Sequence, residues 1–279
     1  MVDLTNLDGL RFDRDGGVAT LTLNRPERLN SFTIDMWDQM REMGEQLVAD
    51  DSIRVLVVRG EGRAFSSGID TAEFGRAFMN LGDGTGDGSG SGDPHADLLA
   101  LIDRMQRAFT WLADAPFVTV ASINGYAYGA GLQCALACDL RIASRSAWLG
   151  LLEFNWGILP DLGGTQRLPR LVGPGKAKEL IFTAAKIDGE EAHRIGLVER
   201  LVNDDALEAE TAALVATLAA QPPLAVRGTK RAINEGMSLP IADGLRAEAE
   251  GQAPCLVSDD MKEAITAALE GRAPNYQGR

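Results

Sequence analysis

Two acidic residues stand out because they lie in an apolar, glycine-rich stretch of the chain. Glu153 and Asp161 are the only ionisable residues between Leu151 and Thr165. Apolar surroundings raise the pKa of a carboxyl group, which suits it to general acid–base catalysis. Each acid can instead cap a helix or pair with Arg167 or Arg170, so for each one a structural role stays equally open.

Two glycine-rich turns, at residues 64–70 and 124–133, each follow an apolar run that predicts a buried strand. The second turn leads into the apolar stretch Leu132–Ala137, which predicts the opening of a helix. N–H groups at a helix start lack partners and carry the positive end of its dipole. One N–H from each turn would polarise a carbonyl group as an oxyanion hole, where one donor is worth about 10²–10³ in rate. Either turn alone is more simply a tight turn without a ligand.

Other catalytic patterns are missing. The chain has two histidines, His95 in a glycine-rich segment and His193 beside acidic residues, where a surface role is expected. The sequence holds no G-x-S-x-G elbow, no G-x-G-x-x-G after a strand and no complete P-loop. Its three cysteines (Cys134, Cys138 and Cys255) have no C-x-x-C spacing, which argues against disulfides and a zinc site and favours a reducing compartment.

The composition is that of an acidic globular protein. The 279 residues include 27 basic and 40 acidic side chains, which gives a net charge of −13. Such a surface repels phosphate backbones and anionic lipid, so nucleic-acid binding is not expected. The first residues do not form a secretory leader, and the apolar segment Phe117–Ala137 contains Asn124 and Gln133, which favours a buried core segment over a membrane span. We therefore expect a cytoplasmic protein.

Hydrophobic patterning predicts alternating strands and helices in the first part of the chain. We expect strands at Val18–Leu23, Ile53–Val58 and Phe117–Ile123 and a helix at Ser31–Val48, which together indicate an α/β core. Glycine at nearly every second position predicts a flexible loop at residues 80–94. Gly173–Lys176 predicts a helix start, and from there the pattern is helical: 176–184, 189–195, 204–220, 224–235, 239–252 and 259–270.

Five segments together resemble the crotonase (enoyl-CoA hydratase/isomerase) superfamily: LTLNRPERLNSF, AFSSGID, INGYAYGAG, ACDLRIAS and GILPDLGGTQRLPRLVG. The resemblance implies an α/β fold, a spiral of ββα units over residues 1–200 that holds the acyl-CoA site. It also implies a C-terminal helical region, residues 201–279, that serves for oligomerisation and as a lid in homotrimers or hexamers. The implied ligand is an acyl-CoA thioester, with no metal and no further cofactor because coenzyme A is part of the substrate.

The resemblance also assigns roles to individual residues. It places the thioester oxygen between the backbone N–H groups of Ile69 and Ala130. Because these contacts use main-chain atoms, the side chains at both positions are free to vary. The coenzyme A and substrate contacts that it implies are Ala64, Ser66, Ser67, Gly68, Ile69, Asp70, Gly129 and Ala130.

The acid–base positions decide between two reactions. Hydratases of the superfamily use two glutamates to hold a water; Glu153 falls on the second position, and Gln133, which cannot take a proton, falls on the first. Asp161 falls where isomerase members carry an aspartate. We therefore expect double-bond isomerisation, in which Glu153 moves the proton, alone or with Asp161. The alternatives are a 2-enoyl-CoA hydratase of fatty-acid or related β-oxidation, in which Gln133 or Asp161 holds the water, and a non-catalytic acyl-CoA-binding protein.

Overall fold

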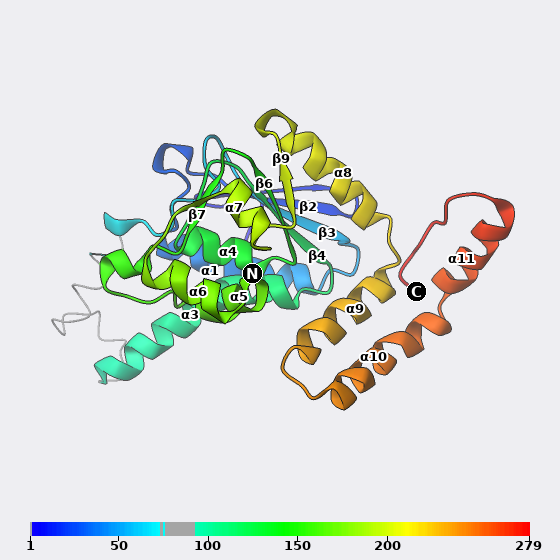
Figure 1. The fold of residues 1–279 in the computed structure, drawn as a ribbon. Helices are drawn as coiled ribbons and strands as arrows, with labels where there is room; N and C mark the ends of the chain where they lie inside the picture. The colour runs from blue at the N-terminus through cyan, green and yellow to red at the C-terminus, as the bar shows by residue number, and fades with distance from the viewer. Residues whose placement is uncertain (1, 73–74, 76–92) are drawn as a thin grey trace.

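The computed structural model describes residues 2–72, 75 and 93–279, and within them the main element is a six-stranded sheet (Figure 1). Its spatial order is β1-β2-β3-β4-β6-β9. β1 pairs antiparallel with β2, and every other neighbouring pair is parallel. The strands are β1 (Leu10–Asp15), β2 (Val18–Leu23), β3 (Val55–Gly60), β4 (Val118–Ile123), β6 (Leu140–Ser144) and β9 (Arg200–Val202).

Alternation along the parallel strands supplies apolar side chains to both faces of this sheet. In β3, Leu56 and Val58 belong to the larger core, whereas Val55 and Val57 belong to a smaller cluster on the other face. The larger core is built with α1 (Ile34–Val48), α3 (Pro94–Asp114) and α4 (Ala130–Ala137). The smaller cluster is closed by α8 (Leu207–Ala219), which packs on β3, β4 and β6. The predicted α/β core is confirmed.

A second, short sheet of β5 (Tyr126–Tyr128), β7 (Trp148–Gly150) and β8 (Ile187–Asp188) lies beside the first. An isolated bridge between Ser66 and Ala127 joins it to the turn that follows β3. The two glycine-rich turns are therefore neighbours in space. The short helices around them are η1 (Pro26–Arg28), η2 (Glu153–Trp156), α5 (Gly164–Val172), α6 (Pro174–Phe182) and α7 (Gly189–Arg194).

The chain ends in a helical arm that extends away from the sheet (Figure 1). It consists of α9 (Pro223–Gly236), α10 (Ile241–Leu256) and α11 (Asp259–Glu270). Since α8 (with η3, Asp204–Ala206, before it) packs on the sheet, the part that extends away from the sheet begins at α9. The arm exposes large apolar side chains, among them Ile241, Leu245, Val257, Ile265 and Leu269.

Several predicted boundaries need correction. The first long helix begins at Ile34 and not at Ser31, because the Thr33 side chain caps it by accepting a hydrogen bond from the Met36 N–H. The strand expected at 53–58 runs from Val55 to Gly60. Of the loop expected at residues 80–94, only 93 and 94 are described: Asp93 caps α3 and Pro94 begins it, so the loop itself lies outside the described residues.

Candidate active site

The two glycine-rich turns, α4 and the Glu153–Leu162 segment enclose a cavity of about 420 Å³. Gln133 from α4 and the two candidate acids, Glu153 and Asp161, all line it. Within the described residues, none beyond Leu162 does, so the C-terminal helical region does not cover the cavity of its own chain. The lining residues are Trp37, Ser67, Gly68, Ile69, Thr71, Gly75, Met105, Tyr128, Gly129, Ala130, Gln133, Leu152, Glu153, Trp156, Ile158, Asp161 and Leu162.

The two expected oxyanion-hole donors lie on this cavity. Ala130 is the first residue of α4, so its N–H has no partner within the helix. The Ile69 N–H makes no hydrogen bond to any described residue. The residues on either side of it are both bonded to Phe32, whose N–H donates to Gly68 O and whose carbonyl accepts from the Asp70 N–H. A Cβ atom on Gly68 would lie 3.6 Å from the Ala130 nitrogen, so the two turns approach closely. The arrangement offers two main-chain donors to one carbonyl oxygen.

Glu153 is held by Gln133. The Gln133 Nε2 donates to Glu153 Oε1 at 2.7 Å, and the two side chains are 1% and 7% exposed. The other carboxyl oxygen, Glu153 Oε2, is buried and has no hydrogen-bond partner among the described residues. Neither Glu153 nor Asp161 forms an ion pair with a described residue; Arg167 instead donates to Leu162 O and Arg170 to Gln166 O. The structural pairing considered from the sequence is therefore absent.

Burial makes both acids weaker than usual. It raises the pKa of Glu153 to about 7, an effect that the bonds from its own N–H and from Gln133 oppose and that the charge of Asp161 increases. Burial also raises the pKa of Asp161. A carboxyl group with a pKa near neutrality exchanges protons readily in both directions at physiological pH.

The structure separates the predicted coenzyme A contacts into two groups. Ser67, Gly68, Ile69, Gly129 and Ala130 line the cavity. The other three have structural partners: Ala64 O accepts from Asn30 Nδ2, Ser66 Oγ donates to Asn30 O, and Asp70 pairs with Arg25 at 3.1 Å. These partners hold the first turn in place beneath the cavity.

The sequence analysis missed the side chains that enclose the cavity from α1, α3 and the η2 segment. Trp37, Met105, Trp156 and Ile158 are apolar residues that sequence patterns assign to an ordinary helix face or loop. The signal available for Trp37 and Met105 was the amphipathic period of their helices, which marks a buried face without saying that it borders a cavity.

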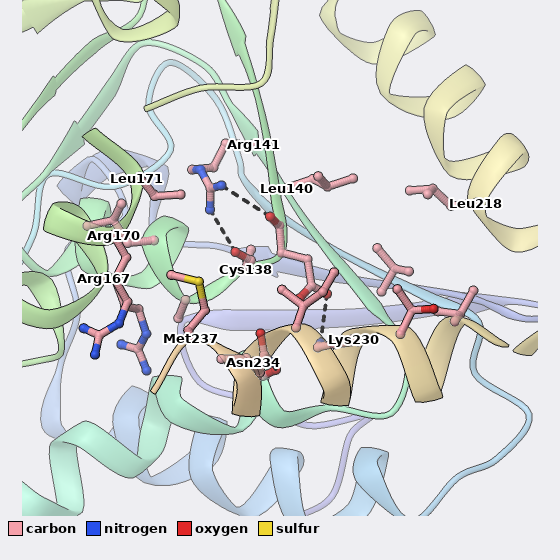
Figure 2. Close-up of a pocket in the computed structure, with 18 of the residues that line it drawn as sticks. Cys138, Leu140, Arg141, Arg167, Arg170, Leu171, Leu218, Lys230, Asn234 and Met237 are labelled. Carbon is pink, nitrogen blue, oxygen red and sulfur yellow. Dashed lines mark hydrogen bonds and ion pairs between the residues drawn. The ribbon is translucent and has the colours of Figure 1, made fainter. Parts of the chain in front are cut away.

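A larger groove of about 760 Å³ lies between α9 and the core (Figure 2). Its charged groups already have structural partners. Lys230 Nζ donates to Asp139 and to Leu112 O and Phe117 O, and the buried Arg141 donates to the Cys138 carbonyl. Figure 2 marks the bonds that Lys230 and Arg141 make to other lining residues. Among the described residues that line the groove, no unpaired acid lies beside an unpaired donor, so the smaller cavity is the candidate active site.

Two further searches bear on function. Among the described residues, no group of three or more His, Cys, Asp or Glu side chains is placed to hold a metal ion. No described helix is both long enough and apolar enough to cross a membrane.

Comparison with known proteins agrees with this geometry. A sequence model of the family described as "Enoyl-CoA hydratase/isomerase" matches residues 13–279. The chain belongs to this family. The family is one of enzymes, and the resemblance to the crotonase superfamily is confirmed. Its crotonase-like α/β fold is confirmed as well by solved structures that cover nearly the whole chain.

The chain is similar to crotonyl-CoA hydratase of Syntrophomonas wolfei, with 34% identity over 96% of this chain and 98% of the relative. It is 35% identical to short-chain-enoyl-CoA hydratase of Clostridium acetobutylicum over 95% and 96% of the two chains. The structure of an enoyl-CoA hydratase from Bacillus anthracis superposes with a TM-score of 0.86 at 33% identity, covering 98% of this chain and 100% of that chain. A Thermobifida fusca protein solved in complex with CoA, 38% identical, superposes with a TM-score of 0.77 over 94% and 95% of the two chains.

Proposed function

We propose that this protein isomerises a double bond in an unsaturated acyl-CoA through an enolate held in the oxyanion hole. The observation that carries the proposal is the pair of weakly acidic carboxyl groups, Glu153 and Asp161, on one cavity that an amide, Gln133, also lines. An acyl-CoA ligand is supported by the family and by the Thermobifida fusca relative solved with CoA.

In the proposed reaction, the thioester oxygen accepts hydrogen bonds from the Ile69 and Ala130 N–H groups. Glu153, ionised, removes a proton from the carbon next to the thioester of a 3-enoyl-CoA. The electron pair moves onto the thioester oxygen, where the two donors stabilise it. Return of a proton to the far end of the conjugated system, from Glu153 or from Asp161, gives the 2-enoyl-CoA. No atom is gained or lost, so the reaction consumes no oxidant and no other co-reactant.

Hydration of a 2-enoyl-CoA is the second candidate, and the names of the Syntrophomonas and Clostridium relatives favour it. It requires a water held for attack on the double bond. Glu153 would accept a proton from that water, and Gln133 or Asp161 would orient it. The two candidates share the oxyanion hole, so they are distinguished by product and not by binding.

One experiment separates them. The purified protein is incubated in deuterated water with a 2-enoyl-, a 3-enoyl- or a 3,5-dienoyl-CoA, and products are analysed by mass spectrometry. A shifted double bond without added water is the result expected. Addition of one water to the 2-enoyl-CoA, with no shift of any double bond, would replace the isomerase proposal with hydration. Tight binding of acyl-CoA with no product from any substrate would leave the non-catalytic acyl-CoA-binding protein.

We further propose a cytoplasmic homotrimer or hexamer. The apolar side chains exposed on α10 and α11, such as Ile241 and Leu269, are the kind of surface that subunit contacts cover. Light scattering on the purified protein tests the assembly, and a monomer at micromolar concentration would contradict it. Full activity after dialysis against a chelator is expected if no metal takes part.

A further inference from the structure

The candidate active-site cavity has an exposed side and a buried side. Trp156 and Ile158, in η2 and just after it, line the cavity and are 68% and 44% exposed. Trp37 of α1 and Met105 of α3 also line it, and they are only 2% and 4% exposed. Coenzyme A carries phosphate groups that must stay hydrated, whereas an acyl chain gains free energy when it leaves water. The acyl chain of a ligand therefore points toward Trp37 and Met105, and its coenzyme A lies on the side of Trp156.

Aromatic side chains of the core pack against Trp37. The Phe32 ring stacks on the indole, with 6.3 Å between the ring centroids and 13° between the ring planes. Phe109 of α3 meets Phe32 edge-on at 5.3 Å, and both phenylalanines are fully buried and do not line the cavity. A core packed in this way has no free volume into which a neighbouring side chain can move. Trp37 is therefore a fixed wall of the cavity, which an acyl chain cannot push aside.

This wall lies close to the place of the reacting atoms. Phe32 forms an isolated β-bridge with Ile69, one of the two expected oxyanion-hole donors, and stacks on Trp37 through its ring. A single residue thus separates the oxyanion hole from the indole. An acyl chain whose thioester oxygen is held at Ile69 has room for few carbons before it reaches Trp37.

We propose that Trp37 limits the length of the acyl chain and makes this protein selective for short-chain acyl-CoA. The inference rests on the proposed function for the place of the thioester. Each methylene that enters an apolar cavity strengthens binding about fourfold. This gain continues only while the cavity has space, because atoms forced against a packed wall strain their surroundings. Along a series of acyl chains, affinity should therefore stop rising at the length that reaches Trp37.

Calorimetric titration with saturated acyl-CoA measures this limit without turnover, because a saturated chain has no double bond to react. The series consists of butanoyl-, hexanoyl-, octanoyl- and decanoyl-CoA. For the unmodified protein, we expect decanoyl-CoA to bind no more tightly than hexanoyl-CoA. A rise in affinity that continues to decanoyl-CoA would overturn the inference, because Trp37 would then not stop the chain.

Trp37→Ala removes the wall and should move the limit to longer chains. The ratio of the dissociation constant of hexanoyl-CoA to that of decanoyl-CoA should increase at least about tenfold, which corresponds to between one and two further methylenes inside the cavity. Partial loss of the fold would weaken the binding of every acyl-CoA and would not produce this change. Trp37→Leu keeps an apolar side chain in the core and should shift the ratio in the same direction. An unchanged ratio in the folded variant would overturn the inference.

Trp111→Ala is the matched control. Trp111 of α3 also lies between α1 and α3, since a Cβ atom on Gly44 of α1 would be 2.4 Å from its ring. Its indole N–H, like that of Trp37, is buried without a partner among the described residues, but Trp111 does not line the cavity. We expect this variant to keep the ratio of the unmodified protein. An equal shift in the Trp37 and Trp111 variants would contradict the inference, because a loosened pair of helices would then admit the longer chain.

Failure of this inference is distinguishable from failure of the proposed function. If the unmodified protein shows the expected limit but shifts no double bond in any unsaturated acyl-CoA, isomerisation is wrong and Trp37 remains the residue that limits chain length. If it isomerises a 3-enoyl-CoA and its affinity rises about fourfold per methylene up to decanoyl-CoA, isomerisation stands and the role of Trp37 is wrong.

Discussion

Glu153→Gln is predicted to slow catalysis strongly and to stabilise the fold at neutral pH. Burial raises the pKa of Glu153 from 4.5 to about 7. A tenfold change in an acid dissociation constant corresponds to about 1.4 kcal/mol, so ionised Glu153 lowers the free energy of unfolding by about 3 kcal/mol. Its side chain is 7% exposed, so solvent screening reduces this figure little.

The pH dependence of the effect follows from the direction in which the pKa moves. Because the pKa is raised in the folded state, the native protein holds more protons than the unfolded chain between pH 4.5 and about 7. The stability contributed by protonated Glu153 is complete below pH 4.5 and is lost as the pH rises through 7. Glutamine does not titrate, so the variant does not undergo this loss.

The assay is urea unfolding of both proteins at pH 5.5 and pH 8. Both values lie above 4.7, the pI of the protein, at which its solubility is lowest. The free energy of unfolding of the variant should exceed that of the unmodified protein by about 2 kcal/mol more at pH 8 than at pH 5.5. The rest of the total difference of about 3 kcal/mol develops below pH 5.5. Glu190→Gln is a control, because Glu190 makes only an exposed ion pair with Arg145 and should show no such change. Parallel stability curves for Glu153→Gln and the unmodified protein would refute the reasoning.

The same variant has a kinetic signature. Removal of a general acid–base group lowers the rate by about 10²–10⁴-fold, and we expect this in kcat with KM little changed. In the unmodified protein, kcat/KM should rise with pH to a half-maximum near pH 7, because Glu153 must be ionised to remove a proton. Turnover by Glu153→Gln within about threefold of that of the unmodified protein would contradict the assigned role.

Three further substitutions test the site and its support. Asp161→Asn should lower isomerisation about 100-fold and move the acid limb of the pH–rate profile to lower pH, because the charge that raises the pKa of Glu153 is lost. An acid limb at the same pH as in the unmodified protein would contradict this influence of Asp161 on Glu153. Gly164→Ala places a Cβ 2.8 Å from Pro160 and 2.9 Å from the Gln133 oxygen, so both kcat and the Tm should fall; unaltered values would show that the close approach is dispensable. Arg141→Met removes a buried guanidinium that pairs with Glu199, and should cost about 3–5 kcal/mol in urea unfolding.

Local sequence patterns predicted the core strands because each is a short apolar run bounded by polar residues, as in β2 and β4. They did not predict β1 or α3. β1 alternates apolar and charged residues, and its Leu10 is buried while its last three residues are exposed, so its place depends on pairing with β2. α3 follows directly on the glycine-rich segment, and its Asp93 cap marks a boundary that hydrophobic periodicity alone does not locate.

For the candidate site, spacing along the chain was enough to select Glu153 and Asp161, since both lie in one apolar segment that returns to the cavity. The enclosing residues were not predictable in this way. Trp37 and Met105 reach the cavity only because α1 and α3 pack against each other, a contact between segments far apart in the chain. Sequence alone also cannot tell which groups the oxygen and the nitrogen of an amide such as Gln133 will bond.

The contacts of Gln133 explain how the chemistry of this site can change without a change of fold. The start of α5 requires an acceptor at position 133, because the Gly164 N–H and the neighbouring Leu162 N–H are otherwise unpaired inside the protein. Only a side chain of this length that ends in an oxygen meets the requirement, which limits the choice to glutamine or glutamate. Both residues satisfy the helix, but only glutamate takes up a proton. Structural demand therefore restricts position 133 to two residues that differ in whether they exchange a proton.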